Sequence, residues 1–166
     1  MLFSTQNQAN QVVHIEPLEK GTKGRALLME TLSRQYVELR ETFDFQTDVS
    51  RWQKAFWFSS EELGHSFQAQ MGAQDSPYAQ FKQRGITRSV IIKNSAAVGP
   101  SAPNVWIVEW ESIDRDPKTG TEHHGFWLST ITADCVERMV NLEDQYLNPI
   151  GFSVTHYTVS NQSTRN

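Results

Sequence analysis

The spacing of apolar residues changes near Gly85 from a helical period to a strand period. Ahead of Gly85, apolar residues recur every three or four positions, which predicts an amphipathic helix over about residues 24–42. These residues are Leu28, Leu32, Tyr36, Leu39 and Phe43. Beyond Gly85, apolar and polar residues alternate, as they do in strands. A chain that is helical first and extended afterwards is predicted to be α+β, with helices packed on one face of an antiparallel sheet.

Two further helices are expected between this first helix and the strands. Asp48 is suited to cap a helix that carries Trp52 and Phe56, and Ser59 with Glu62 forms a capping-box pattern for the next. We expect Gly72 to end that third helix. The many aromatic residues of this region are interpreted as core residues, because their helical spacing already explains them.

Four strands are predicted in the second half. The first carries Ile86, Val90 and Ile92 on one face, and residues 96–103 are expected to form a loop. The second covers about residues 105–113, with Trp106, Val108 and Trp110 on one face. Residues 114–120 have the composition of a hairpin loop, and a third strand follows over about 122–136. Residues 141–147 are expected to form a helical turn.

The segment Asn148-Pro149-Ile150-Gly151-Phe152 is predicted to form a turn that starts the last strand. Proline favours extended geometry in the residue before it, and Gly151 can take backbone angles that other residues avoid. Phe152, Val154 and His156 then alternate with Ser153, Thr155 and Tyr157, which predicts a strand with two different faces.

That turn, with the string Tyr36-Val37-Glu38-Leu39-Arg40-Glu41, closely resembles the periplasmic domain of the eighth VirB protein. This protein is an inner-membrane subunit of type IV secretion systems, and TraE, TrwG and DotI belong to the same broad group. The resemblance covers about residues 36–159. It implies a nuclear-transport-factor-like cone, in which three N-terminal helices pack on a curved four-stranded antiparallel sheet.

Several positions match the family's pattern. Asn148, Pro149, Gly151 and Phe152 match its signature turn, whereas Tyr157 matches a tyrosine that lies near a surface groove in family members. Thr158 stands where the family usually has arginine, which puts any contact made by that charge in doubt.

The function that the resemblance implies is assembly in a conjugation or effector-transfer machine, without catalytic residues, cofactor or metal. Expected partners are a second copy, as a weak homodimer, and other secretion subunits such as the tenth VirB protein. We predict Tyr36, Glu38 and Arg40 as self-association residues, with Glu38, Arg40 and Glu41 on the solvent side of the helix. Direct contact with nucleic acid is not expected, because the net charge is −4 and the basic residues are scattered.

Three segments are expected. Residues 1–23 are interpreted as a flexible membrane-proximal linker or as residues added for expression, with a short extended piece at Val12–Ile15. Residues 24–160 are interpreted as a single domain, and residues 161–166 as a disordered tail. No stretch of the sequence reaches the roughly 18 apolar residues of a membrane span. The resemblance therefore suggests a domain on the periplasmic side of the inner membrane, separated from its single-pass anchor.

One enzymatic alternative remains open, because cone-shaped domains of this class include isomerases and dehydratases. The candidate bases would be Asp44, Asp134 or His156, in a pocket walled by three aromatic residues, Trp106, Trp110 and Phe126. A metal site at His123-His124 is not expected, because adjacent side chains of a strand point to opposite faces. His156 on a neighbouring strand would not complete the ligand set.

Overall fold

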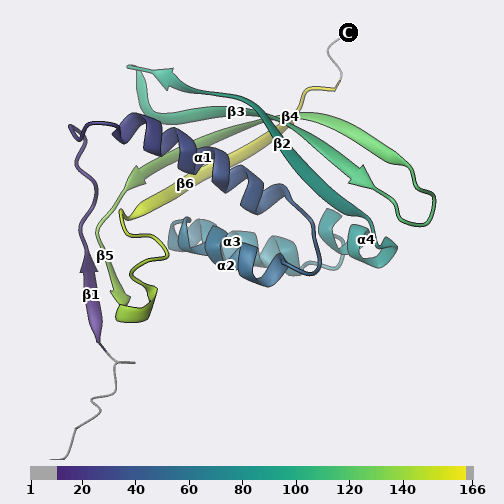
Figure 1. Cartoon of the computed structure of the whole chain (residues 1–166), viewed down its shortest axis with the longest axis horizontal. Coiled ribbons are helices and arrows are strands. Elements are labelled where there is room, and N and C mark those ends of the chain that lie inside the picture. Colours follow the sequence, from purple (N-terminus) through teal and green to yellow (C-terminus); the bar gives the residue numbers. More distant parts are fainter. Residues whose placement is uncertain (1–10, 164–166) are drawn as a thin grey trace, which may run out of the picture.

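The computed structural model describes residues 11–163 and contains four α-helices and six strands within that range (Figure 1). The helices are α1 (Arg25–Glu41), α2 (Asp48–Trp57), α3 (Glu61–Gly72) and α4 (Pro77–Arg84). The strands are β1 (Val12–Ile15), β2 (Thr87–Gly99), β3 (Ala102–Arg115), β4 (Glu122–Cys135), β5 (Arg138–Asn141) and β6 (Phe152–Asn161). A short 3-10 helix, η2 (Leu142–Asp144), lies between β5 and β6. None of the helices described has the length and apolarity that crossing a membrane requires.

The main sheet is antiparallel, with four strands in the order β2-β3-β4-β6. This confirms the predicted α+β class and the four-stranded antiparallel sheet. β3 and β4 form a hairpin whose strands end at the pair Arg115 and Glu122. In its loop the N–H of Gly120, at φ 69°, donates to the carbonyl of Asp116 (2.9 Å). Of the loop predicted over residues 114–120, residues 116–120 lie in the hairpin connection, whereas Asp114 and Arg115 are still paired in β3.

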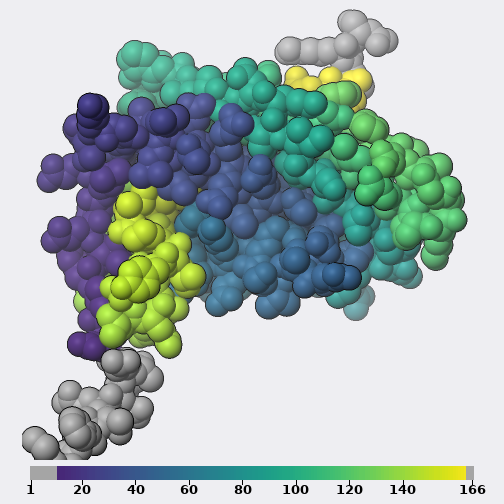
Figure 2. Space-filling view, viewed as in Figure 1, coloured from purple at the N-terminus to yellow at the C-terminus, as the bar shows by residue number. Residues whose placement is uncertain are grey.

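The core lies between the sheet and α1, which contacts β2, β3 and β4, while α2 packs on α1 and α3 reaches β6 (Figure 1). In the space-filling view the blue helical segments lie directly against the teal strand segments (Figure 2). Trp106, Val108 and Trp110 of β3 are all buried, as their shared face predicted.

The buried face of α1 is displaced from the predicted apolar stripe. Its buried residues are Met29, Ser33, Tyr36, Val37 and Arg40, whereas Leu28 is 36% exposed. The Ser33 hydroxyl is satisfied inside the helix, where it donates to the carbonyl of Met29 (2.8 Å). A pattern built from apolar residues alone omits such buried polar positions. The predicted apolar stripe is therefore rotated away from the face of α1 that is buried.

The prediction of three helices was wrong by one. Ser76 caps α4 by accepting a hydrogen bond from the N–H of Ala79 (3.1 Å), and Pro77 occupies the first turn. Gly85 ends the helix at φ 73°. Serine, proline and glycine are the ordinary signals of helix ends, but two short turns between them leave little periodicity to detect. The caps of the two preceding helices are each displaced by one residue from the prediction. The cap of α3 is Ser60 rather than Ser59, and that of α2 is Thr47 rather than Asp48, which is the first residue of the helix.

The loop predicted at residues 96–103 is mostly strand. β2 continues to Gly99 and β3 begins at Ala102, so only Pro100 and Ser101 lie outside the two strands, although the register shifts between Ala97 and Gly99. Ala97 pairs with Trp106 across it. Pairing to a well-packed neighbouring strand overrides the weak strand propensity of alanine and glycine.

A bulge in β6 corrects the predicted alternation of its faces. Thr132 pairs with His156 but the next residue, Ala133, pairs with Val154, so Thr155 is an extra residue in the ladder. One inserted residue exchanges the two faces of everything that follows it. His156 is therefore exposed, and Tyr157 rather than His156 packs against the core.

The N-terminal segment joins the fold through β1, which forms a two-stranded antiparallel sheet with β5. The pairing places Val12 opposite Asn141 and Ile15 opposite Arg138. The segment predicted as a flexible linker thus contains a paired strand, and its residues 1–10 lie outside the described part. Residues 164–166 of the predicted tail also lie outside it, whereas Asn161 belongs to β6. The domain boundaries at residues 24 and 160 stay predictions.

Candidate functional site

The turn before β6 is built around the side chain of Asn148, which is buried. Its carbonyl oxygen accepts from the N–H of Phe152 (2.9 Å), and its amide nitrogen donates to the carbonyl of Phe152 (2.7 Å) and to that of Trp57 (3.0 Å). Both backbone groups of Phe152 are thereby satisfied as they would be by a neighbouring strand. Asn148 shapes the turn through side-chain to backbone bonds, as expected for asparagine in such places.

Gly151 has φ 70°, which is the left-handed region that the sequence predicted for it. A Cβ atom there would lie 2.0 Å from the carbonyl oxygen of Val136, which is backbone and has little freedom to move. The Val136 N–H in turn donates to the Gly151 carbonyl (2.8 Å). Two independent constraints, backbone angle and close approach, therefore require glycine at this position.

Arg138 reaches the same region from β5 and was missed by the sequence analysis. Its guanidinium donates to the carbonyls of Trp57 (2.8 Å) and Ser59 (3.0 Å) and to the hydroxyl of Ser153 (3.2 Å). Trp57 is the last residue of α2, so the Arg138 guanidinium also lies at the negative end of that helix's dipole. Burial lowers the pKa of Arg138. No sequence signal links residue 138 to a helix that ends 81 positions earlier.

A groove of about 360 Å³ opens on the helical side of β6. Helix α1 supplies Arg40, Glu41 and, just beyond its end, Phe43, while α3 and the start of α4 form the opposite wall. The remaining lining residues are Phe67, Gln70, Met71, Pro77, Tyr78, Arg88, Trp127, Tyr157 and Val159. The structure thus places Tyr157 at a groove, and the function of this groove is still a prediction.

Tyr157 begins a line of hydrogen bonds that runs from this groove into the core. Its hydroxyl donates to the Glu41 carboxyl (2.7 Å) and lies 3.1 Å from the Ser129 hydroxyl. Ser129 also accepts from the Trp110 indole (2.9 Å). Burial raises the pKa of Glu41, whereas the hydrogen bond from Tyr157 and the charge of Arg40 oppose that rise. Burial raises the pKa of Tyr157 as well, and the neighbouring Glu41 adds to the effect.

Arg40 lies between two aromatic rings, with its guanidinium carbon 4.3 Å from the centre of Phe67 and 4.4 Å from that of Tyr157. It also donates to the Tyr36 hydroxyl (3.3 Å), which is 2.7 Å from the Ser59 hydroxyl. Such cation–π contacts stabilise a charge that has been taken out of water.

Two of the three predicted self-association residues are internal. Tyr36 is fully buried and Arg40 is 7% exposed, so the placement of Arg40 on the solvent side was wrong. The aromatic rings of the core offer this arginine an interior site, which a charge-based prediction of exposure overlooks. Glu41, also predicted on the solvent side, is half-buried and lines the groove, so Glu38 alone is exposed as predicted.

The three candidate bases of an enzyme do not converge. Asp134 is bound by Arg25 (2.6 Å), Asp44 accepts from the N–H of Gln46 (3.2 Å), and His156 is exposed. The three aromatic residues predicted as pocket walls do not line one pocket either, because Phe126 is 47% exposed whereas Trp106 and Trp110 are buried in the core. The groove does contain a carboxyl of raised pKa, Glu41, and its Oε1 atom is occupied by Tyr157.

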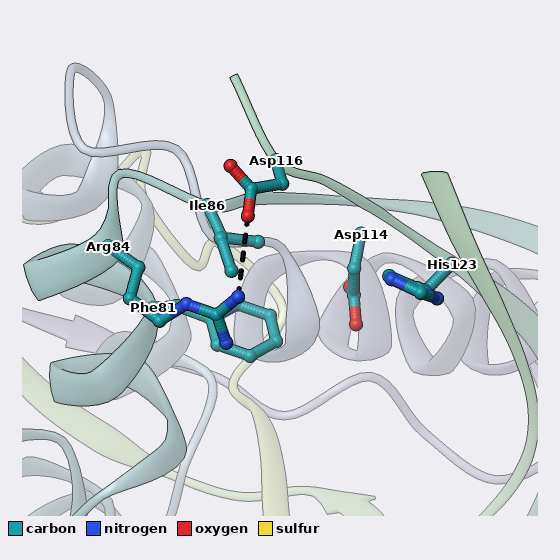
Figure 3. A pocket seen from close by; sticks show the side chains of 6 residues that line it. All are labelled: Phe81, Arg84, Ile86, Asp114, Asp116 and His123. Atoms are coloured by element: carbon teal, nitrogen blue, oxygen red, sulfur yellow. Dashed lines mark hydrogen bonds and ion pairs between the residues drawn. The ribbon is translucent and has the colours of Figure 1, made fainter. Parts of the chain in front are cut away.

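His123 and His124 are adjacent in β4 but have different neighbours, because His124 Nδ1 lies 2.6 Å from the Glu111 carboxyl. His123 borders a separate pocket of about 190 Å³ beside the β3–β4 hairpin, next to Asp114 (Figure 3). Both carboxylates there are engaged: Asp114 receives two bonds from Arg88 (2.6 and 2.8 Å), and Asp116 pairs with Arg84 (3.3 Å). Within residues 11–163, no three histidine, cysteine or acidic side chains are grouped to hold a metal ion.

Comparisons with known proteins agree with this geometry. The VirB8 protein family model matches residues 2–162. The type IV secretion system protein virB8 of Brucella abortus is 29% identical over 129 residues, which cover 75% of this chain and 52% of the relative. The chain therefore spans about half the length of the curated relatives it matches.

Two solved structures share the fold. The VirB8 protein of Agrobacterium tumefaciens superposes with a TM-score of 0.73 at 20% identity, covering 90% of this chain and 100% of the other. The TrwG component of a type IV secretion system from Bartonella birtlesii gives 0.71 at 20% identity, covering 93% and 99%.

Proposed function

Because the chain belongs to the VirB8 family, we propose that it is the periplasmic domain of an inner-membrane type IV secretion subunit and acts in assembly. The family match over residues 2–162 carries this proposal, and it includes the turn at Gly151. The curated relatives are type IV secretion system proteins by name. The proposed role is to form part of the machine's inner-membrane platform.

An assembly role agrees with the interactions of the side chains that line the groove. Tyr157 and Arg40 are both held by interactions inside the domain. An isomerase of similar shape would need a positioned base at the floor of an apolar pocket. The carboxyl nearest to that description, Glu41, is bound by Tyr157 and lies on the wall of an open groove.

Finer features of the proposal rest on the family resemblance. The α+β arrangement is proposed to be the nuclear-transport-factor-like cone, held at the periplasmic side of the inner membrane by a single-pass anchor. Proposed partners are the tenth VirB protein and a second copy of the domain. For the second copy, exposed positions of α1 such as Glu38 and Leu27 supply the surface, since Leu27 is 71% exposed.

The proposal can be tested by complementation in a bacterium whose type IV system lacks the gene for this subunit. The unaltered gene should restore transfer of DNA or effector protein. Gly151→Ala should not restore it, because a Cβ there overlaps the Val136 carbonyl oxygen. Gly120→Ala in the hairpin loop has the same φ without such a neighbour, and as the matched control it should restore transfer. Full transfer in the deletion strain would contradict an assembly role.

A further inference from the structure

The outer edge of β6 is satisfied along only half of its length. In its first half the Phe152 backbone binds the Asn148 side chain, and the Val154 N–H donates to the carbonyl of Phe58 (2.8 Å). The Val154 carbonyl accepts from the N–H of Ser60 (2.8 Å). Beyond the bulge at Thr155 these covering groups end.

The second half leaves backbone groups pointing away from the sheet. The Gln162 N–H donates to the carbonyl of Phe126 (2.7 Å), which fixes the alternation of the ladder. His156, Thr158 and Ser160 therefore turn their N–H and C=O groups toward β4. The intervening residues, Tyr157, Val159 and Asn161, turn theirs outward, and no described residue binds those groups.

This half of the edge also has none of the features that normally protect an edge strand. Natural edges carry lysine, proline or inward charges that discourage pairing with another chain. From Phe152 to Asn161 the sequence contains no proline and no Asp, Glu, Lys or Arg. The bulge lies before the open half, and Val159 is 39% exposed.

We propose that the free edge at Tyr157, Val159 and Asn161 binds an extended segment of another polypeptide as a fifth strand of the sheet. Unpaired N–H and C=O groups at alternate residues match an extended backbone, and strand addition is a recurrent form of peptide recognition. The groove lies beside this edge, lined by Tyr157 and Val159. Side chains on one face of the added strand enter it.

The groove selects the chemistry of that segment. Its walls include the rings of Phe67, Tyr78 and Trp127, and its charges are matched, since Arg88 is paired with Asp114 and Arg40 adjoins Glu41. A neutral strand with an aromatic or aliphatic residue facing the groove fits best. The opposite wall, formed by α3 and α4, favours a single strand over a second copy of the domain, which would bring its own helices.

A library of linear twelve-residue peptides displayed on phage, selected on the immobilised domain, tests this inference. Enriched peptides should alternate β-branched residues around an aromatic or aliphatic position. Each should slow hydrogen exchange at the amides of Tyr157, Val159 and Asn161, while Thr158 and Ser160 change little because β4 already binds them. Peptides that protect α1 instead, or a library that yields no enriched sequence, would overturn the proposal.

Two controls make the result specific to the edge. Val159→Pro removes one outward N–H, which an edge strand tolerates, and should weaken binding by about tenfold or more. Methylating the peptide amides that face β6 should abolish binding to the unaltered domain, whereas methylating the alternate amides should not. Equal binding in both comparisons would refute strand addition.

Concentration-dependent protection of the same amides without peptide would instead identify a second copy as the occupant and overturn the choice of partner. The inference depends on the proposed assembly role in one respect, namely that the role supplies another polypeptide to bind the edge. Failure of peptide binding would leave the complementation result unchanged.

Discussion

Replacement of Gly151 by alanine should cost far more stability than replacement of Gly120, although their φ angles, 70° and 69°, are nearly equal. Left-handed geometry costs a non-glycine residue about 1–2 kcal/mol, and both variants bear that cost. No atom lies within 4 Å of a Cβ at Gly120, whereas at Gly151 it would lie 2.0 Å from the Val136 carbonyl oxygen. Relieving this overlap moves the turn away from Val136, just beyond β4, and breaks the Val136–Gly151 hydrogen bond, with a net loss of about 1 kcal/mol.

With the repacking of Phe152 that follows, Gly151→Ala should lose about 3–5 kcal/mol and Gly120→Ala about 1–2 kcal/mol. Chemical denaturation monitored by tryptophan fluorescence measures both, and equal m-values allow the midpoints to be compared directly. For a chain of this length the difference of about 2–3 kcal/mol corresponds to a gap in Tm of about 4–12 °C between the variants. If the two variants lost the same stability, the close approach at Val136 would have no energetic consequence and the reasoning would fail.

Three further predictions concern the turn, the groove and the surface. Asn148→Ala should lose about 2–4 kcal/mol in the same denaturation assay, because three buried hydrogen bonds disappear and the Phe152 backbone is left without partners; a loss below 1 kcal/mol would show that water replaces the amide. Glu41→Gln should change the pH dependence of stability: burial raises the pKa of Glu41 above its ordinary 4.5, so the unaltered protein loses stability as pH rises through the folded-state pKa. Denaturation midpoints between pH 4 and pH 8 should fall less steeply in that variant, and parallel curves would contradict the assignment. Glu38→Arg should shift weak self-association more at low salt than at high salt, as measured by sedimentation over a wide concentration range, if exposed positions of α1 form the contact; an unchanged equilibrium would place the contact elsewhere.

The elements that the sequence predicted well are those whose signal is local. The period of α1 and the alternation of Trp106, Val108 and Trp110 follow from one face of a single element, and Gly151 follows from its own neighbours. The family resemblance added Tyr157, which indeed lines the groove.

The features that the sequence did not reveal depend on pairing between distant segments. The bulge at Thr155 arises from the register of β6 against β4, and a strand pattern read alone cannot show which residue is extra. Arg138 acts on a helix end far away in the chain, and β5 is defined by its pairing with β1. Arg40 reads as a surface residue until Phe67 and Tyr157 enclose it.

The bond between Asn148 and Pro149 has a consequence for the chemical ageing of the protein. Asparagine deamidates when the nitrogen of the following residue, after losing its proton, attacks the side-chain amide to form a succinimide. Proline has no N–H to lose, which closes this route. Conversion to aspartate would remove the amide donor to Trp57 and Phe152 while keeping an acceptor for Phe152. Pro149 therefore protects the Asn148 side chain, which binds both backbone groups of Phe152, from deamidation over the lifetime of the molecule.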